Sequence, residues 1–202
     1  MMSIDYYNQN AEKFIKDTIN VDMGQLYERF EKYLNHGDTI FDIGCGSGRD
    51  SQYFMEKGYD VYAHDGSPAM VEQTRKLIGD HVALATFDTF DPVACFHKKI
   101  AFNGLWACAS LLHVPEEEMA DILNQYLSFL AKNGIFFMSF KRRASNHEKD
   151  GRIFTNYTKE KLEKLLEKLG PIRIVEYLET VDVRQGREDE GWISVIIKKE
   201  SE

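Results

Sequence analysis

The fold of this chain is decided by one stretch, Phe41-Asp42-Ile43-Gly44-Cys45-Gly46-Ser47-Gly48-Arg49-Asp50. The short apolar run Thr39–Ile43 is typical of a buried strand, and it leads directly into three glycines. Glycine permits the backbone angles of a tight turn and lets a ligand approach the main chain closely. A helical pattern then begins at Asp50. This order of strand, glycine loop and helix predicts a nucleotide-binding or nucleoside-binding unit of an α/β protein.

A second strand, over residues 60–64, ends at Asp65, where a carboxylate can accept hydrogen bonds from both hydroxyls of a ribose. A dinucleotide loop would have a third glycine where this chain has Arg49, and Asp50 adds negative charge where a phosphate would bind. A phosphate-binding P-loop is excluded here because no Gly-Lys-Ser/Thr follows. A nucleoside without phosphates therefore fits better. The remaining alternative is a glycine turn that only packs a helix on a strand.

The rest of the chain alternates between helical and strand patterns. Near-continuous apolar strands between helices indicate a parallel sheet covered on both faces. Two strands near the end, joined by the charged segment 184–191, predict an antiparallel hairpin at the sheet edge. Ser67 and Pro68 are expected to begin one helix, and Asn133-Gly134 to cap another. We expect helices over residues 7–18, 26–34, 50–57, 67–77, 115–132 and 158–169, and strands over 39–43, 60–64, 81–85, 100–107, 135–140, 172–183 and 192–199.

Composition limits the class of protein. The chain has 202 residues, and 25 Lys and Arg against 33 Asp and Glu give a net charge of −8. With roughly 150 residues per domain we expect one domain. The acidic balance disfavours nucleic acid as a partner, because phosphates need clustered Lys and Arg.

No run of about 18 apolar residues predicts a membrane span, and Met1–Thr18 lacks the apolar centre of a secretory signal. Three scattered cysteines fit neither a disulfide framework nor a zinc site, so we expect a cytoplasmic protein without a metal.

Four motifs in order resemble those of the class I S-adenosylmethionine-dependent methyltransferases. Two further segments resemble the N-terminal lid and the loop after strand five of a small-molecule branch, which includes methyltransferases of the tellurite-resistance type. Asn103 departs from this pattern, since most relatives have Asp there. The four motifs are residues 42–48, 65–70, 106–114 and 130–136, and the two further segments are 7–11 and 150–158.

The resemblance implies a Rossmann-like, doubly wound α/β domain with a seven-stranded sheet and an N-terminal helical lid. The implied strand order is 3-2-1-4-5-7-6, with strand seven antiparallel. Residues 1–36 are expected to form the helical cap and residues 37–140 the cofactor-binding core. Residues 141–202 are expected to supply the substrate-side loop, a helix and the terminal hairpin. We expect a monomer or a homodimer whose partner is a small-molecule substrate.

The resemblance also implies a site for S-adenosylmethionine. The amides and carbonyls of Gly44, Cys45 and Gly46 are expected beside the methionine part, and Asp65 on the ribose. The register after the third strand leaves Thr86 or Thr89 as alternatives to an acid on the adenine. Residues expected around the adenine are Gly66, Ser67, Met70, Phe87 and Asp88, and residues expected beneath the sulfonium are Trp106 and Ala107.

Three side chains near this site have two open interpretations each. Arg49 pairs either with the carboxylate of the cofactor or with Asp50. Tyr7 either closes over the ligands or packs in the core. His113 is a candidate general base, or it packs at the start of a long helix. The other histidines are expected at the surface or at strand ends; they are His36, His64, His81, His97 and His147.

A basic cluster follows the fifth strand and therefore falls at the rim of the expected site. It comprises Lys141-Arg142-Arg143, Lys149 and Arg152. Lys141 and Arg152 are the candidate contacts of an anionic substrate, and a solvated loop is the alternative.

The sequence predicts methyl transfer from S-adenosylmethionine to a small molecule by in-line displacement, which needs alignment and exclusion of water rather than a metal. The alternatives are a non-catalytic protein that binds S-adenosylmethionine or S-adenosylhomocysteine, and a nicotinamide-dependent oxidoreductase.

Overall fold

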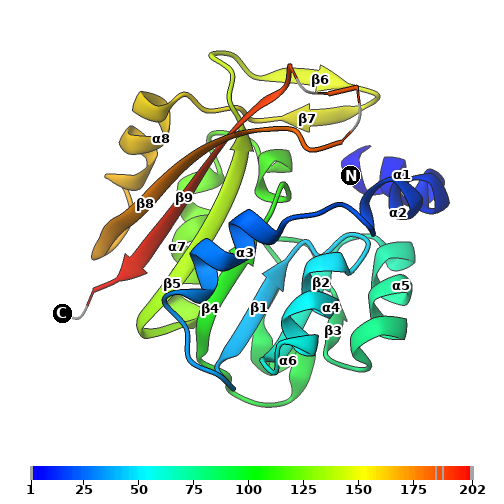
Figure 1. Ribbon diagram of the computed structural model, residues 1–202, viewed down its shortest axis with the longest axis vertical. Helices are drawn as coiled ribbons and strands as arrows, with labels where there is room; N and C mark the ends of the chain where they lie inside the picture. Colours follow the sequence, from blue (N-terminus) through cyan, green and yellow to red (C-terminus); the bar gives the residue numbers. More distant parts are fainter. Residues whose placement is uncertain (1, 185, 188, 201–202) are drawn as a thin grey trace.

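A computed structural model describes residues 2–184, 186–187 and 189–200 of the protein. Residues 185 and 188 of the predicted connecting segment lie outside the described residues. The main sheet has seven strands in the order β3-β2-β1-β4-β5-β9-β8 (Figure 1). These strands are β1 (Thr39–Ile43), β2 (Asp60–Asp65), β3 (Val82–Leu84), β4 (Phe102–Ala107), β5 (Leu130–Lys141), β8 (Ile172–Val181) and β9 (Gly191–Lys199).

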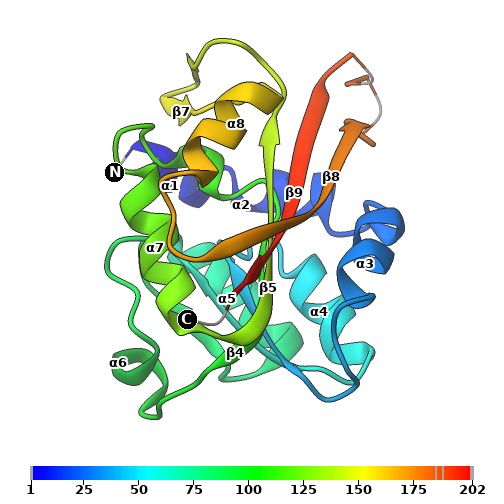
Figure 2. The same cartoon turned by 90° about the vertical axis from the view of Figure 1, so that its left-hand side faces the viewer.

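Helices cover both faces of the sheet, as the side view shows (Figure 2). The buried side chains of α3, α4 and α5 pack in the core on one face, and those of α7 and α8 pack on the other. The helices are α1 (Met2–Gln9), α2 (Ala11–Thr18), α3 (Gly24–Glu31), α4 (Arg49–Glu56), α5 (Pro68–Ile78), α6 (Pro92–Phe96), the 3-10 helix η1 (Leu111–His113), α7 (Met119–Phe129) and α8 (Lys159–Leu166).

The observed strand order confirms the expected doubly wound sheet. The first five strands along the chain pair in parallel, and β9 pairs antiparallel with both β5 and β8. In the predicted numbering, β8 is strand six and β9 is strand seven. Because β1 and β4 are adjacent while the chain leaves them in opposite directions, a crevice opens at their carboxyl ends.

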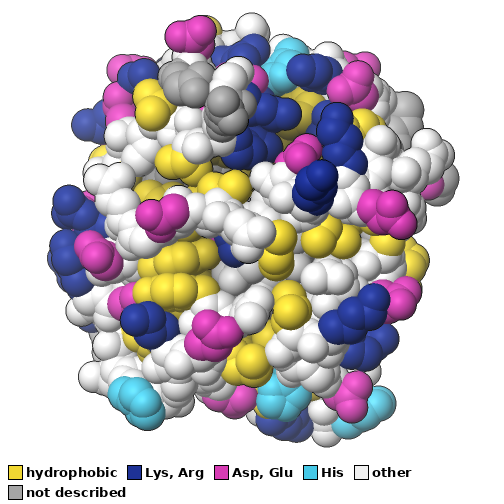
Figure 3. Space-filling view, turned by 45° about the vertical axis from the view of Figure 1, so that its right-hand side comes forward, with side chains coloured by type: hydrophobic (Ala, Val, Ile, Leu, Met, Phe, Trp, Pro, Cys, Tyr) yellow, Lys and Arg dark blue, Asp and Glu magenta, His cyan; other side chains and the backbone are white. Residues whose placement is uncertain are grey.

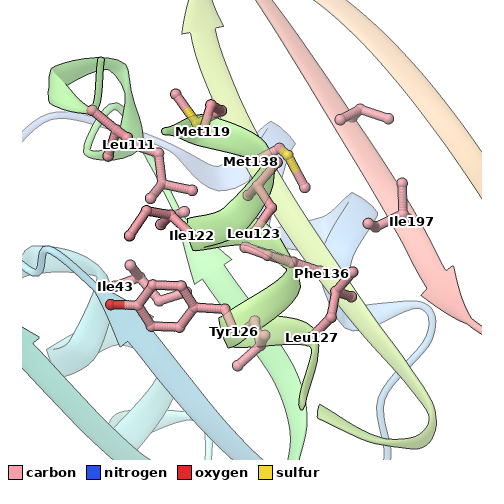
Figure 4. Close-up of a cluster of buried hydrophobic side chains, with 14 of the residues drawn as sticks. Ile43, Leu111, Met119, Ile122, Leu123, Tyr126, Leu127, Phe136, Met138 and Ile197 are labelled. Atoms are coloured by element: carbon pink, nitrogen blue, oxygen red, sulfur yellow. The ribbon is translucent and has the colours of Figure 1, made fainter. Parts of the chain in front are cut away.

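The core on the α7 face is built from large apolar side chains of α7, β4 and β5 (Figure 4). Leu123 and Tyr126 of α7 are fully buried, as are Phe136 and Met138 of β5. Burial of a side chain of this size contributes about 1.5–3 kcal/mol to the free energy of unfolding. The sheet that carries the crevice is therefore a rigid platform.

The N-terminal helical region differs from prediction. The expected helix over residues 7–18 is two helices, α1 and α2, and together with α3 they make three where two were expected. The break falls at Asn10, whose side-chain amide donates to the carbonyl of Tyr6 at 2.9 Å. Asparagine side chains that bond nearby backbone in this way compete with a continuous helix. The break lets α1 and α2 lie at an angle over the end of the sheet (Figure 1).

The prediction for the end of the long helix is wrong. The helix α7 stops at Phe129, and β5 starts at Leu130, so Asn133-Gly134 caps no helix. Leu130 is extended, 3% exposed and paired with Phe102 of β4. Burial of this leucine against the sheet outweighs its helix propensity.

A short hairpin after β5 was not predicted. It consists of β6 (His147–Lys149) and β7 (Arg152–Phe154), joined by Asp150 and Gly151, both with positive φ. An Asp-Gly pair between two strands is a strong hairpin signal, so the sequence does carry the information. His64 lies next to the last residue of β2, as expected of a strand-end histidine, and it is 1% exposed. In the described part of the chain, no helix is both long and apolar enough to cross a membrane.

Candidate functional site

A cavity of about 1280 Å³ lies at the carboxyl ends of β1, β2 and β4. The glycine loop after β1 and the end of β2 form one side of it. Helices α1 and α2, which we call the lid, border it, and residues of the β6–β7 hairpin and of the β8–β9 tip line its far end. In the space-filling view, Lys and Arg side chains gather in the upper part of the face shown (Figure 3).

The glycine loop is held tightly against β2. Gly44 has a φ of +71°, and a Cβ at this position would lie 2.6 Å from the Cβ of Ser110. Only glycine satisfies both conditions. The amides of Gly44 and Cys45 both donate to the carbonyl of His64, at 3.0 Å each. These two amides are therefore used within the fold, while both residues line the cavity.

Asp65 ends β2 and faces the cavity. One carboxylate oxygen accepts from the Gly46 amide at 2.9 Å, and the other accepts from the Ser67 amide at 2.8 Å. Burial raises the pKa of Asp65, and hydrogen bonds from three backbone amides oppose this shift. A carboxylate has about four acceptor sites, so the fixed Asp65 side chain can still accept a hydrogen bond from a ligand.

The lid reaches the far end of the cavity through Tyr7. Its hydroxyl lies 2.8 Å from Nε2 of His113, and Nδ1 of His113 lies 2.8 Å from the carbonyl of Ile153. A carbonyl only accepts, so Nδ1 carries the proton, Nε2 accepts, and Tyr7 donates. Burial, together with the charges of Arg152 and Lys141, lowers the pKa of His113 to about 4. The imidazole is therefore neutral at physiological pH.

Two cations stand at the far end of the cavity. Lys141, at the end of β5, pairs with Glu190. Arg152, on β7, contacts Asp150 at 3.3 Å and stacks with its guanidinium carbon 3.7 Å from the centre of the Tyr6 ring. The side chains of Lys141 and Arg152 are 10% and 12% exposed.

Arg49 pairs with Asp50, which settles one open interpretation for the free protein. Its guanidinium donates to both carboxylate oxygens of Asp50, at 2.6 and 3.0 Å. Tyr27 and Trp106 donate to the same carboxylate at 2.5 and 2.9 Å. Burial acts to raise the pKa of Asp50, but the Arg49 charge and these hydrogen bonds outweigh it, and the pKa is lowered. The network joins α3, α4 and β4 beside the cavity.

The pKa of a second buried carboxyl, Asp42, is shifted in the opposite direction. Burial first, then the nearby charge of Asp50, raises its pKa to about 8, against the hydrogen bond from Ser51 at 2.6 Å. The folded state therefore keeps a proton that the unfolded chain releases above its ordinary value of 3.8. Between these two values the folded state binds more protons, so this group makes stability fall as pH rises.

Replacing Asp42 by Asn is expected to remove that dependence, because the amide matches the protonated acid in shape and still accepts from Ser51. Urea unfolding of the variant and the parent protein should be compared from pH 5 to pH 9. The free energy of unfolding of the variant, minus that of the parent, should increase steadily with pH up to about pH 8. A difference that stays constant over this range would show that Asp42 is ionised in the folded protein.

Most of the predicted site residues line this one cavity, and four do not. Trp106 and Ala107 lie within β4, buried in the core on opposite faces of the sheet, and neither lines the cavity. The side chain of Ser67 caps α5 and donates to Asn8 of the lid. Asp88 is exposed and accepts from Thr86. The predicted residues that line the cavity are Tyr7, Gly44, Cys45, Gly46, Arg49, Asp65, Gly66, Met70, Phe87, His113, Lys141 and Arg152.

Sequence reasoning missed several lining residues. The residues that line the cavity here directly follow β4, rather than belonging to the strand itself; they are Cys108, Ala109 and Ser110. Ala109 has a φ of +54°, a backbone kink that no residue type signals in advance. The Ser110 hydroxyl is buried and has no hydrogen-bond partner among the described residues. Within the described chain, no group of three or more His, Cys, Asp or Glu could hold a metal ion.

Comparison with known proteins identifies relatives of this arrangement. Residues 40–134 match the model of a family described as a methyltransferase domain. Methyltransferase GfsG of Streptomyces halstedii is 28% identical over 107 residues, which cover 49% of this chain and 38% of that protein. The chain spans less than two thirds of the length of the curated relatives that it matches.

Solved structures share the whole fold. The 1,6-didemethyltoxoflavin-N1-methyltransferase of Burkholderia thailandensis, with bound 1,6-didemethyltoxoflavin and S-adenosylhomocysteine, superposes with a TM-score of 0.75 at 18% identity. That match covers 98% of this chain and 86% of the other. The N-methyltransferase NodS from Bradyrhizobium japonicum WM9, in complex with S-adenosylhomocysteine, gives a TM-score of 0.67 at 15% identity, over 96% and 98% of the two chains. At these identities the likeness is one of fold.

Proposed function

We propose that this chain, a member of the class I S-adenosylmethionine-dependent methyltransferases, transfers the methyl group of S-adenosylmethionine to a small-molecule acceptor. The observation that carries this proposal is the single cavity that holds Asp65 and the glycine loop together with Tyr7 and His113. At about 1280 Å³ it is larger than the roughly 300–1,000 Å³ typical of a site for one small ligand. It therefore has room for a cofactor and an acceptor together.

The residues present fit the nucleoside half of S-adenosylmethionine. Asp65 would accept the ribose hydroxyls, and Met70 and Phe87 would flank the adenine. The absence of a side chain at Gly44 lets Ser110 and Phe87 pack closely against the loop. The unpartnered Ser110 hydroxyl offers a buried polar contact in the same region. A buried hydroxyl without a partner is costly, so a polar ligand group beside it would be stabilising.

When bound, S-adenosylmethionine supplies a methyl group already activated by a positive sulfur, so the protein has to align the acceptor and exclude water. The lid serves the second purpose, because Asn8 contacts Ser67 and Tyr7 contacts His113 across the cavity. Tyr7 serves to align the acceptor, because its proton is committed to Nε2 of His113 and its oxygen is left in the role of a hydrogen-bond acceptor. The Tyr7 oxygen can thus accept a hydrogen bond from an acceptor N–H or O–H.

The same pair gives a route for a proton. When the acceptor loses its proton to the Tyr7 oxygen, the phenol proton can pass to Nε2 of His113. Nδ1 of His113 keeps its own proton on the carbonyl of Ile153. His113 is neutral throughout the physiological range, because its pKa is lowered to about 4, so Nε2 has no proton of its own and would hold one from Tyr7 only briefly.

The proposal is tested by incubating the protein with S-adenosylmethionine and a panel of thiols, amines, oxyanions and carboxylates. Mass spectrometry then follows S-adenosylhomocysteine and the methylated product. S-Adenosylhomocysteine should accumulate only with particular acceptors, with one product methyl per molecule formed. If the protein binds S-adenosylhomocysteine and no acceptor class yields product, the alternative of a non-catalytic binding protein is correct.

Replacing Tyr7 by Phe is expected to lower kcat by about a hundredfold, since positioned proton transfer contributes that order of magnitude. The dissociation constant of S-adenosylhomocysteine should change by less than about threefold, because the phenol contacts the acceptor half of the cavity. Tyr33→Phe, at an exposed position shortly after the end of α3, is the matched control. A parallel loss of cofactor affinity would place Tyr7 on the cofactor instead.

The proposal includes a small molecule rather than a nucleic acid as acceptor. Support comes from the net charge of −8 and from a reacting site closed by a lid. We also propose a reducing, cytoplasmic location, because Cys45, Cys95 and Cys108 are all free thiols. The proposal also includes a monomer or a homodimer as the oligomeric state.

A further inference from the structure

The far end of the cavity is rich in positive charge. Of the described lining residues from position 141 onward, seven are Lys or Arg and five are Asp or Glu. This excess stands out in a chain with a net charge of −8. Cation-rich concave sites attract and concentrate anions. The acceptor half of the cavity therefore has the opposite electrostatic character to the protein as a whole.

Two of these cations lie close to the same aromatic ring. The Lys141 Nζ lies 5.3 Å from the centre of the Phe154 ring, and the Arg152 guanidinium carbon lies 5.2 Å from it. Both side chains are nearly buried, so each lacks most of the hydration that an exposed charge would have. Buried charges are stable only when they are paired.

The acids present do not fully satisfy this pair. Arg152 has one contact with Asp150, at 3.3 Å, and that acid is 54% exposed. The Arg152 Nε is buried and has no hydrogen-bond partner in the described structure. Lys141 has the single partner Glu190, and burial and the like charge of Arg143 both lower its pKa. An anion bound between these side chains would relieve both the desolvation and the repulsion.

Cations on the rim add to the surplus. Arg143 and Lys149 line the cavity and form no ion pair with any described residue. Both charges contribute to a lowered pKa of His147, which also lines the cavity, although burial is the largest cause. An approaching anion would therefore meet positive charge at the entrance before it reaches Lys141 and Arg152.

Aromatic rings form the walls around the same two cations. Lys141 Nζ is 5.9 Å from the centre of the Trp192 ring, and the Arg152 guanidinium carbon is 5.7 Å from the centre of the Tyr7 ring. Tyr7, Phe154 and Trp192 all line the cavity. Flat aromatic side chains make good stacking surfaces for a flat ligand. The charges of both Asp65 and Arg152 affect the pKa of Tyr7, so Tyr7 lies between the two ends of the cavity.

We propose that the methyl acceptor is a small aromatic carboxylate, with its carboxylate between Lys141 and Arg152 and its ring among Tyr7, Phe154 and Trp192. This inference deepens the proposed function and rests on it for the word acceptor. The anion site itself stands on the charges and rings alone. Binding in this orientation would place the reacting substituent of the ligand ring beside the Tyr7 hydroxyl, where the proposed proton transfer begins.

The test uses benzoate as a probe, with benzamide and acetate as comparisons, and measures dissociation constants by ligand-observed NMR on protein saturated with S-adenosylhomocysteine. Benzoate should bind at least about tenfold more tightly than benzamide, because a charge-assisted hydrogen bond is worth at least that factor. It should also bind more tightly than acetate, because acetate has no ring to stack. Equal affinity for benzoate and benzamide would overturn the proposed anion recognition, and equal affinity for benzoate and acetate would overturn the ring site.

Variants of the two cations and of the acid that pairs with Lys141 should change benzoate affinity in opposite directions. Lys141→Met and Arg152→Met should each weaken benzoate by about tenfold or more. Glu190→Gln should tighten it severalfold, because the acid that competes for Lys141 is removed; a merely structural ion pair predicts no such gain. Lys76→Met, an equal change of charge on exposed α5, should leave the affinity unchanged. Unchanged benzoate affinity in Lys141→Met and Glu190→Gln would contradict the proposal.

Failure of the proposed function is separable from failure of this inference. Affinity for S-adenosylhomocysteine is measured first, on the same samples. If that ligand does not bind, the benzoate and benzamide titrations on the free protein still decide whether an aromatic anion site exists. Binding of S-adenosylhomocysteine without preference for benzoate would reject the anion site and leave the methyltransferase proposal standing.

Discussion

Replacing Asp50 by alanine is expected to lower the free energy of unfolding by about 3–5 kcal/mol, the usual cost of breaking a buried ion pair by removing one partner. The carboxylate is 6% exposed and accepts hydrogen bonds from Arg49, Tyr27 and Trp106. Its loss would leave the Arg49 guanidinium nearly buried without a counter-charge. It would also leave the Tyr27 hydroxyl and the Trp106 indole N–H without their acceptor.

Urea unfolding followed by circular dichroism measures this effect. Domains have a total stability of about 5–15 kcal/mol, so the midpoint should fall by a large fraction. Asp50→Asn keeps an acceptor oxygen and should lose less, and Asp17→Ala on the lid, outside this network, serves as a control. If Asp50→Ala unfolds within about 1 kcal/mol of the parent protein, the network contributes little, and the positions of α3 and α4 rest on apolar packing alone.

The second large effect is on ligand affinity. Asp65→Ala is expected to weaken the binding of S-adenosylhomocysteine by about 10- to 150-fold, because charge-assisted hydrogen bonds are worth about 1.5–3 kcal/mol. The amides of Gly46 and Ser67 hold the carboxylate in place before any ligand arrives. Binding therefore costs little loss of conformational entropy at the Asp65 side chain. Most of the free energy of its hydrogen bonds to the ligand should appear as affinity.

The fold of the Asp65 variant has to be checked, because the same two amides lose their acceptor. Asp65→Asn retains one oxygen and should show an intermediate affinity, while Asp80→Ala, fully exposed beyond α5, should bind like the parent protein. Isothermal calorimetry at one ionic strength compares the four proteins. Parent-like affinity in Asp65→Ala would mean that the ribose lies elsewhere in the cavity.

Much of the fold could be predicted because its signals are local. The glycine loop, the Ser67 cap and the terminal hairpin depend on residue types at fixed positions. The strand order, in contrast, came from the resemblance to a family, since periodicity alone does not say which strands pair. The end of α7 could not be predicted, because it depends on Leu130 meeting Phe102 from a distant strand.

The candidate site was predicted in part for the same reason. Asp65 and Gly44 follow directly from the motif, and the structure brings both to the cavity. Trp106 does not line the cavity, because the motif predicts a strand but not the face on which each residue lies; its indole N–H donates to Asp50. The pairing of Tyr7 with His113 joins residues 106 positions apart, and no local pattern encodes such a contact.

The central claim is that the cavity binds S-adenosylmethionine through Asp65 and the glycine loop. It is tested most directly by calorimetric titration of the intact, folded protein with S-adenosylhomocysteine and, separately, with NAD. We predict saturable binding of S-adenosylhomocysteine at one molecule per chain and no heat with NAD. No heat with S-adenosylhomocysteine, or tighter binding of NAD, would contradict the account.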